Sequence, residues 1–357
     1  MLKVKSVRDL GPQFTNNQHR MVGQDGSYSI PLHDGRVLWF FGDTIIGRRI
    51  PGESLWYPGG KAVGPKDMSG VGGTEKMLNN TGLLSSSDPI KDGINSFSYI
   101  TDHSGRLKQL IPLNKDEDPD RYRVWCMHGI EMDSTVYLFF IKVETIEEGI
   151  FPVNFTILGS GMAYGSMNDW NFKRVEFDGS DLLWKIDQPH FASAVLGPEG
   201  DYLYLYGVLQ GKDKIQRCYL SRVKKQEILE LDKYEYLSGI MPEWSKCIED
   251  AIPVFDGMPN EQSVSYNKYL GRYLAVHSLD LSGKIIARTS LTPWGPWSEP
   301  CELFQVETDP SVQLPYPRLI YAGKEHPVIA KDDGKTIYVT YVEFEEYYPH
   351  LVEVNFE

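Results

Sequence analysis

The chain has 357 residues, 41% of them hydrophobic and 24% charged, which fits one large or two ordinary folded domains and argues against a disordered chain. Its formal net charge of −13 opposes binding to phosphate backbones, and no basic stripe is visible, so we expect no nucleic-acid partner. The four cysteines are far apart and form neither a disulfide framework nor a zinc pattern.

The N-terminal segment predicts a soluble chain. Met1–Lys5 lacks the apolar core of a signal peptide, and the sequence has no run of 18 apolar residues. We therefore expect no membrane partner and a cytoplasmic location, unless a leader has been removed. The oligomeric state stays open at this point.

The stretch from Gln24 to Thr44 reads as one β-hairpin. Its second strand is an apolar and aromatic run that follows the tight-turn pair Asp34-Gly35. Folding about this turn brings Asp25 and Asp43 to the same open end, where opposed Cβ atoms are about 5 Å apart. Two carboxylates this close repel, so one pKa should rise, and the pair is a candidate for acid–base or nucleophilic chemistry. The alternative is that both aspartates cap turns or hold a structural cation.

A long segment, Gly47–Met77, follows this hairpin. It is rich in glycine and proline and has no strand period, and loops of this length are usually functional. Because it leaves the strand that ends at Asp43, we expect Arg48, Trp56 and Tyr57 to contact the substrate. The alternative is a packing lid without ligand contacts.

The hairpin pattern recurs along the chain, and each copy is followed by a further strand-like segment. The apolar runs after the five turns are Arg36–Phe41, Thr135–Phe140, Asp201–Tyr206, Arg272–His277 and Lys335–Tyr341. Four antiparallel strands repeated in this way are typical of propeller blades around a channel. We therefore predict an all-β, five-bladed β-propeller with four antiparallel strands per blade, a central pocket and little helix. A single domain spans 1–357, with blades at about 20–110, 120–180, 188–240, 258–305 and 320–357, and with 2–8 closing the last blade.

Positions that differ between the copies are candidates for a functional site. Eight residues beyond the turn glycine the first copy has Asp43, whereas an ungapped count gives Lys142, Val208, Leu279 and Val342 in the others. Asp43 is therefore not a structural requirement of a blade.

Polar residues near the starts of the inner strands are predicted to face the mouth of the channel. Ten residues before the turn glycine, the first, third and fourth copies carry Asp25, His190 and Glu261. We add His128 from the second copy and His326, beside Glu325, from the fifth. Carboxylates around a polar pocket suit glycoside hydrolysis, in which one acid protonates the leaving oxygen and another carboxylate attacks or activates water. That chemistry requires no cofactor; a structural divalent cation in the central channel is the competing use of these groups.

Several motifs resemble known families. Gln24-Asp25-Gly26, Asp34-Gly35-Arg36 and Phe41-Gly42-Asp43-Thr44 resemble the pattern of a bacterial propeller group of unknown function, part of which is classed as glycoside hydrolase family 183, the endo-D-arabinanases. Ile286–Ser290, Gly295–Pro300 and Glu325-His326-Pro327 are similar to segments of the five-bladed furanosidase propellers of families 43, 62, 32 and 68.

The resemblance implies a five-bladed propeller with a central active site, in which Asp25 and Asp43 match two signature aspartates. The pattern of families 43 and 32 fits Asp25 and Glu261, but the aspartate that it requires in the third blade is met only by Asp187, three residues off register. The resulting hypothesis is a glycoside hydrolase acting on a furanose-containing, arabinan-like carbohydrate. Its predicted catalytic residues are Asp25, Asp43 and Glu261, and its predicted substrate-binding residues are His128, His190, His326, Arg48, Trp56 and Tyr57. The alternative is a non-catalytic carbohydrate-binding or cation-binding propeller.

Overall fold

The computed structural model of the protein describes residues 2–50, 54–56, 73–87, 90–197, 200–308 and 314–357. These residues form β-strands and short 3-10 helices, with no α-helix among them, so the prediction of an all-β fold with little helix is confirmed. The 3-10 helices are η2 (Lys225–Glu227), η3 (Leu231–Lys233), η4 (Ile248–Asp250), η5 (Pro327–Ile329) and η6 (Asp332–Gly334). No helix in the described ranges has the length and apolar character needed to span a membrane.

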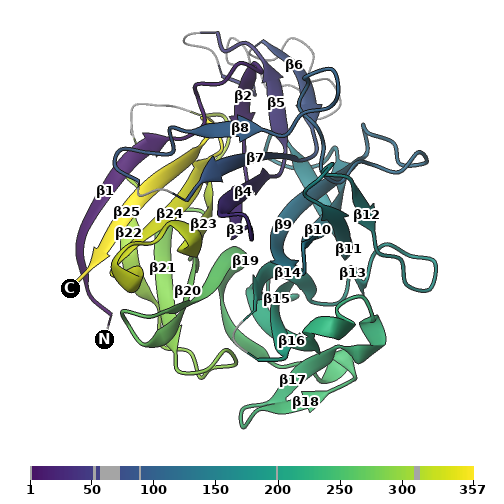
Figure 1. Ribbon diagram of the computed structural model, residues 1–357, viewed down its shortest axis with the longest axis vertical. Coiled ribbons are helices and arrows are strands. Elements are labelled where there is room, and N and C mark those ends of the chain that lie inside the picture. Colours follow the sequence, from purple (N-terminus) through teal and green to yellow (C-terminus); the bar gives the residue numbers. More distant parts are fainter. Residues whose placement is uncertain (1, 51–53, 57–72, 88–89, 198–199, 309–313) are drawn as a thin grey trace.

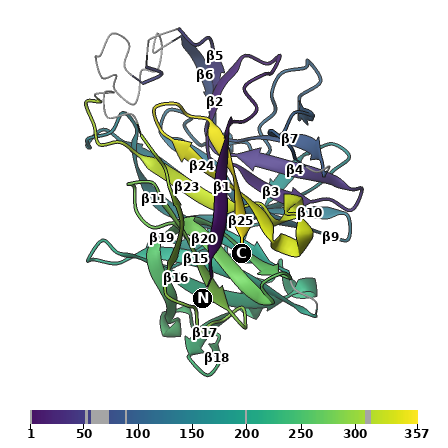
Figure 2. The same ribbon diagram turned by 90° about the vertical axis from the view of Figure 1, so that its left-hand side faces the viewer.

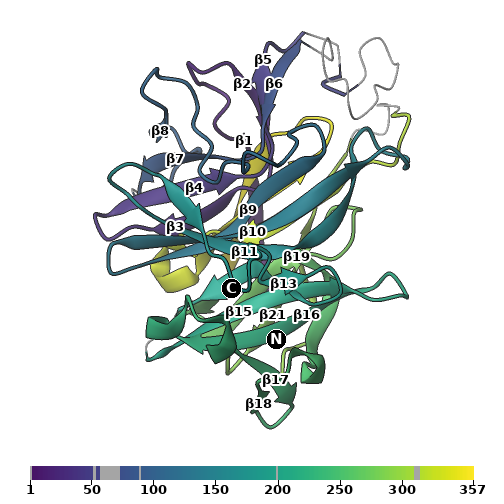
Figure 3. The same cartoon turned by 90° about the vertical axis from the view of Figure 1, so that its right-hand side faces the viewer.

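The predicted first hairpin is present and contributes to two consecutive sheets. Its strands are β2 (Met21–Gln24), β3 (Tyr28–Pro31), β4 (Arg36–Phe41) and β5 (Thr44–Gly47). A three-stranded sheet has the order β2-β5-β6, and a four-stranded sheet has the order β3-β4-β7-β8. The added strands are β6 (Thr74–Leu78), β7 (Thr81–Ser86) and β8 (Phe97–Tyr99). Figures 2 and 3 show β2, β5 and β6 at one end of the molecule and the β17–β18 hairpin at the other.

The second hairpin turns at Asp133 and Ser134, as predicted, within a five-stranded sheet of order β12-β11-β10-β9 in which β13 also pairs with β11. Its strands are β9 (Tyr122–Met132), β10 (Thr135–Ile146), β11 (Asn154–Ser166), β12 (Phe172–Arg174) and β13 (Trp184–Lys185).

The third and fourth hairpins lie in one nine-stranded sheet, because β16 pairs with both β15 and β19. The third hairpin is β14 (His190–Leu196) and β15 (Tyr202–Gln210), and the strands that follow it are β16 (Gln216–Lys224), β17 (Glu235–Gly239) and β18 (Glu243–Ser245). The fourth hairpin is β19 (Pro253–Asn267) and β20 (Arg272–Ser278), and the strands that follow it are β21 (Lys284–Ser290) and β22 (Cys301–Gln305).

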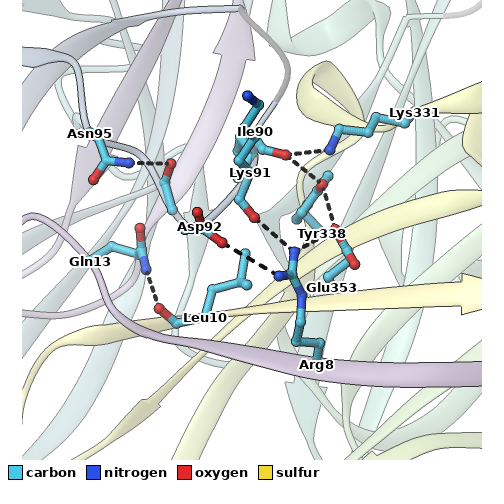
Figure 4. Close-up of polar contacts among 11 residues, drawn as sticks. Arg8, Leu10, Gln13, Ile90, Lys91, Asp92, Asn95, Lys331, Tyr338 and Glu353 are labelled. Atoms are coloured by element: carbon cyan, nitrogen blue, oxygen red, sulfur yellow. Dashed lines mark hydrogen bonds and ion pairs between the residues drawn. The ribbon is translucent and has the colours of Figure 1, made fainter.

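The last sheet joins the two ends of the chain, in the order β1-β25-β24-β23. Its strands are β1 (Val4–Pro12), β23 (Ile320–Glu325), β24 (Thr336–Glu343) and β25 (Pro349–Phe356), and β1 runs antiparallel to β25. Figure 1 shows the two termini close together beside this sheet. In Figure 4, Arg8 of β1 contacts Glu353 of β25 and, on the other side, the carbonyl of Lys91 at 2.7 Å and the carboxylate of Asp92.

The first strands of the five hairpins are neighbours around the centre of the molecule (Figure 1). β3 contacts β9, β9 contacts β14, β14 contacts β19, and β19 contacts β23. The 3-10 helix η5, which follows β23, contacts β3 again. Side chains from these central strands therefore converge from distant parts of the sequence.

Burial on both faces explains why the strand β4 is apolar from Val37 to its end at Phe41. All five side chains of Val37–Phe41 are fully buried, and because side chains alternate across a strand they enter two different cores. Leu38 and Phe40 pack against side chains of β9 and β10, whereas Val37, Trp39 and Phe41 pack with Tyr338 and Leu351 of the C-terminal sheet. The strand that leads to Asp43 is thus fixed from both sides.

Candidate active site

Each of the five central strands has an irregularity in its pairing at the level of the cavity, either within the strand or just before it. The irregular stretches are Asp25–Ser27 between β2 and β3, Met127–His128 in β9, Phe191–Ser193 in β14, Pro259–Glu261 in β19 and Ala322–Gly323 in β23. Bulges are common beside active sites because they re-aim side chains and end the ladder locally. Four of these five stretches contribute residues to the central cavity described below.

Asp25 and Asp43 meet where the first hairpin is interrupted. The Asp25 amide donates a hydrogen bond of 3.3 Å to the carbonyl of Asp43, and the Gly42 amide donates one of 3.0 Å to the carbonyl of Asp25. Gly26 and Ser27 both have positive φ, at 78° and 59°, which turns the chain out of the ladder. A Cβ at Gly42 would lie 2.6 Å from Oδ1 of Asp25, so a side chain there would displace the carboxylate. The structure therefore brings the two predicted aspartates together.

A cavity of about 300 Å³ opens at this point. Its carboxylates are Asp25, Asp43 and Glu261, so the fourth-copy glutamate reaches the pocket of the first-copy aspartates, as its register in the repeat predicts. Most of the remaining wall is apolar or aromatic, including Trp56, Trp125, Met127, Phe151, Phe155, Leu281, Leu319, Phe344 and Tyr347. Apolar walls with a few converging polar groups are typical of sites for small ligands.

The two aspartates have different surroundings. Burial raises the pKa of Asp25 to about 6, although a 2.9 Å hydrogen bond from Tyr321 Oη to Oδ2 and the charge of Lys324 oppose the rise. Burial also raises the pKa of Asp43, to about 7, and the charge of Asp25 adds to the rise while Arg123 opposes it. Oδ1 of Asp43 lies 4.0 Å from Nε of Arg123 and accepts no hydrogen bond within the described part of the chain. Burial thus raises the pKa of both carboxyl groups, and the two differ in their partners, since Oδ2 of Asp25 accepts from Tyr321 whereas Asp43 faces Arg123 and Trp125.

The third carboxylate is paired with a buried lysine. Nζ of Lys324 lies 3.7 Å from Oε1 of Glu261. Burial raises the pKa of Glu261, although Lys324 opposes the rise, and burial lowers the pKa of Lys324, although Glu261 opposes that shift. The pair therefore has a charge state that depends on both partners.

The three predicted histidines do not line the cavity. Gly129 N donates to Nδ1 of His128 at 2.8 Å, and the His128 ring meets the edge of Tyr28. His326 is buried between the hydroxyls of Ser29 and Thr340, at 2.8 and 2.7 Å, and His190 is buried in β14. The structure gives no support for a substrate contact by these three side chains, because each is packed within the sheets.

The residues predicted from the long loop have different outcomes. Trp56 is buried, lines the cavity, stacks on Phe344 with ring centroids 4.4 Å apart, and donates from Nε1 to the Phe344 carbonyl. Arg48 is exposed and does not line the cavity, and Tyr57 lies outside the described residues. Asp187, the off-register match to a third-blade aspartate, is exposed and away from the cavity.

Three side chains that contact the cavity carboxylates were not predicted from the sequence: Tyr321, which lines the cavity, and Lys324 and Arg123, which lie behind its lining. A signal for one of them exists, since counting ten residues back from the fifth turn glycine, Gly334, gives Lys324. Within the described residues no cluster of three or more His, Cys, Asp and Glu side chains has the geometry of a metal site.

Comparisons with known proteins agree with this fold. The model of the family described as "Domain of unknown function (DUF4185)" matches residues 11–353, while no curated protein matches the sequence. A proposed hydrolase from Bacteroides ovatus ATCC 8483 has a similar structure, with a TM-score of 0.65 at 14% identity, covering 97% of this chain and 87% of its own. A family 117 glycoside hydrolase from the marine bacterium Zobellia galactanivorans gives a TM-score of 0.52 at 9% identity, covering 98% and 90%. These likenesses establish a shared all-β, propeller-like fold.

Proposed function

The chain belongs to the DUF4185 family, and from the geometry of its central cavity we propose that it is a glycoside hydrolase acting on a furanose-containing, arabinan-like carbohydrate. The observation that carries the proposal is the meeting of Asp25 and Asp43 in an apolar cavity, where burial raises the pKa of both and their hydrogen-bond and charge partners differ. Pairs of carboxyl groups with pKa values set apart by their environment are the usual acid and base of glycosidases. The motif resemblance to the family 183 endo-D-arabinanases supports the choice of a furanose polymer.

The proposed mechanism gives the two aspartates separate roles. Asp43, whose pKa burial and the neighbouring Asp25 raise to about 7, donates its proton to the leaving oxygen. Asp25, held as an anion by Tyr321 and Lys324, attacks the anomeric carbon and forms a glycosyl ester as the bond to the leaving group breaks. Asp43, now ionised, removes a proton from water, and the resulting hydroxide displaces Asp25. Opposed hairpin positions place Cβ atoms about 5 Å apart, and we propose retention, for which the two carboxyl groups must also be about 5 Å apart.

Glu261 and Trp56 have supporting roles in this proposal. Glu261 faces the same cavity from β19 and accepts hydrogen bonds from sugar hydroxyls, or acts as an auxiliary acid. Trp56 and the other aromatic side chains form an apolar wall against a sugar face. We also propose that the sheets are five blades of a propeller, which the neighbouring order of β3, β9, β14, β19 and β23 supports.

The test is hydrolysis of purified polysaccharides by the full chain, measured as new reducing ends. The panel contains D-arabinan, linear L-arabinan, xylan and a pectin, each with wild type, Asp43→Asn and Glu325→Gln. Glu325 is the matched control because it is a buried carboxyl whose pKa burial raises to about 7, yet it does not line the cavity. Cleavage of an arabinan by wild type and Glu325→Gln, but not by Asp43→Asn, is expected, and EDTA should leave it unchanged. Sugar binding without cleavage would overturn the proposal in favour of a carbohydrate-binding propeller.

A further inference from the structure

Lys324 is the buried cation behind the paired carboxylates. Its side chain is about 1% exposed, and its ammonium lies 4.4 Å from the centre of the Tyr28 ring. Nζ donates hydrogen bonds to the carbonyls of Gly26 and, at 2.7 Å, Ala322, and forms the ion pair with Glu261. A fully buried lysine is costly unless it is paired, so a position of this kind needs a reason.

The two backbone bonds of Lys324 hold both sides of one active-site contact. Gly26 directly follows Asp25, and Ala322 directly follows Tyr321, whose hydroxyl donates to Asp25. Gly26 and Ala322 both have positive φ, at 78° and 61°, a backbone conformation that depends on support from its surroundings. The ammonium group of Lys324 therefore links the segment that carries Asp25 to the segment that carries Tyr321, the hydrogen-bond donor of Asp25.

The charge of Lys324 also has few groups to balance it. The titratable side chains that face it are Glu261, Asp25, Tyr28, His128 and His326. Burial and the charge of Lys324 keep both histidines neutral, and burial keeps Tyr28 protonated. Among the described residues, negative charge next to the ammonium therefore comes from Glu261 and Asp25.

We infer that Lys324 is a positioning residue that fastens the Asp25 segment and holds negative charge on Asp25 and Glu261. The inference rests on the proposed function for its catalytic meaning, since the anion on Asp25 is the proposed nucleophile. The effect of Lys324 on the protonation of Asp25 and Glu261 does not depend on the proposed function, because it can be measured without any substrate.

The test compares Lys324→Met with Lys331→Met. Lys331 is the matched control: its Nζ also donates to a backbone carbonyl, that of Ile90 (Figure 4), and lies 5.2 Å from the centre of the Tyr338 ring, and Lys331 does not line the cavity. Carboxyl carbons labelled with ¹³C in Asp and Glu are titrated by NMR without substrate, and the signals are assigned with Asp25→Asn and Glu261→Gln. Lys324→Met should raise the Asp25 pKa by about one unit or more, which is a tenfold change in proton affinity, and Lys331→Met should not change it.

A second variant covers the case in which Lys324→Met does not fold. Lys324→Met/Glu261→Gln removes both charges of the pair and leaves no unpaired buried ion, and the Asp25 pKa should still rise relative to Glu261→Gln. An unchanged Asp25 pKa in whichever variant folds overturns the inference. If an arabinan is cleaved, the acidic limb of the kcat/KM profile should move to higher pH in the same variants. A shifted pKa in a chain that cleaves no sugar would refute the proposed function and leave the inference standing.

Discussion

The hydroxyl of Tyr321 donates a 2.9 Å hydrogen bond to Oδ2 of Asp25, whereas Oδ1 of Asp43, across the same hairpin, accepts none from the described residues. Two chemically identical groups on one hairpin thus differ because a strand nearly 300 residues away in sequence supplies a donor to one of them. This asymmetry supports the proposed roles of Asp25 as nucleophile and Asp43 as acid, and it can be tested residue by residue.

Tyr321→Phe should weaken the anion on Asp25 without altering the fold, since only the hydroxyl is removed. A hydrogen bond to a charged group contributes about 1.5–3 kcal/mol, so kcat/KM should fall about 10- to 100-fold and the Asp25 pKa should rise. The measurements are steady-state kinetics against pH and the carboxyl NMR titration. Tyr338→Phe is the control, because Tyr338 donates a bond of the same length to Glu353 outside the cavity (Figure 4). Equal losses in both variants would contradict the assignment.

Asp25→Asn and Asp43→Asn should each lower turnover by about 100-fold or more while leaving the circular dichroism spectrum unchanged. The fold is expected to persist because neither side chain belongs to the apolar cores. Substrates with an activated leaving group separate the roles: they should restore much of the activity of Asp43→Asn, since the acid is then dispensable, and little of that of Asp25→Asn. Rescue of Asp25→Asn alone would exchange the two roles.

The first hairpin could be predicted from local signals, since a turn pair, an apolar strand and two aspartates at fixed distances define its register. The histidines could not be placed in the same way. His128 lies within the irregular stretch Met127–His128 of β9 and His190 lies beside Phe191–Ser193 of β14, and a bulge moves the next side chain to the other face. An ungapped count therefore identifies the level of a residue along the strand but not the face on which it lies.

Lys324 shows the opposite case. Counting back from the turn glycine does lead to this residue, but the expectation that site residues are carboxylates or histidines leads away from it. The tenth residue before Gly334 is Lys324, but a search for carboxylates and histidines passes over it in favour of the neighbouring Glu325 and His326. Tyr321 and Arg123 could not be found in this way, because their roles depend on contacts between separate sheets. Such contacts become visible only once the central strands are placed side by side.

Arg174 offers a test of the frame that supports the second hairpin. Its guanidinium contacts Glu117 at 2.8 Å and Asp181 at 2.6 Å, and Lys142 also pairs with Glu117. Burial alone would raise the pKa of Glu117, but hydrogen bonds from Arg174 and Lys142 lower it to about 2. Arg174→Met leaves two carboxylates without their buried partner and should cost about 3–5 kcal/mol in urea unfolding at pH 7.

The pH dependence of this cluster has a defined sign. Because the folded-state pKa of Glu117 is lowered, its contribution to stability is present above about pH 4.5 and is lost as the pH falls toward 2. The exposed pair of Arg106 and Asp102 provides the control, and Arg106→Met should change stability by no more than about 0.5 kcal/mol. A similar small change in Arg174→Met would show that the cluster does not stabilise the fold.

Asp43 should make the protein less stable as the pH rises, the opposite of the behaviour of Glu117. Its pKa is about 7 in the folded protein and 3.8 as the ordinary value, so between pH 4 and 7 the folded state keeps a proton that the unfolded state releases. Stability therefore falls with rising pH across this window, by up to about 4 kcal/mol from this one group.

The variant Asp43→Asn has no titrating group at residue 43. The free energy of unfolding of the variant minus that of wild type should therefore be larger at pH 8 than at pH 4.5. Urea unfolding of both proteins at the two pH values measures this difference, with Glu325→Gln as a second buried carboxyl expected to behave alike. A difference between variant and wild type that is independent of pH would mean that Asp43 is ionised in the folded protein throughout, which would remove it as the proposed acid.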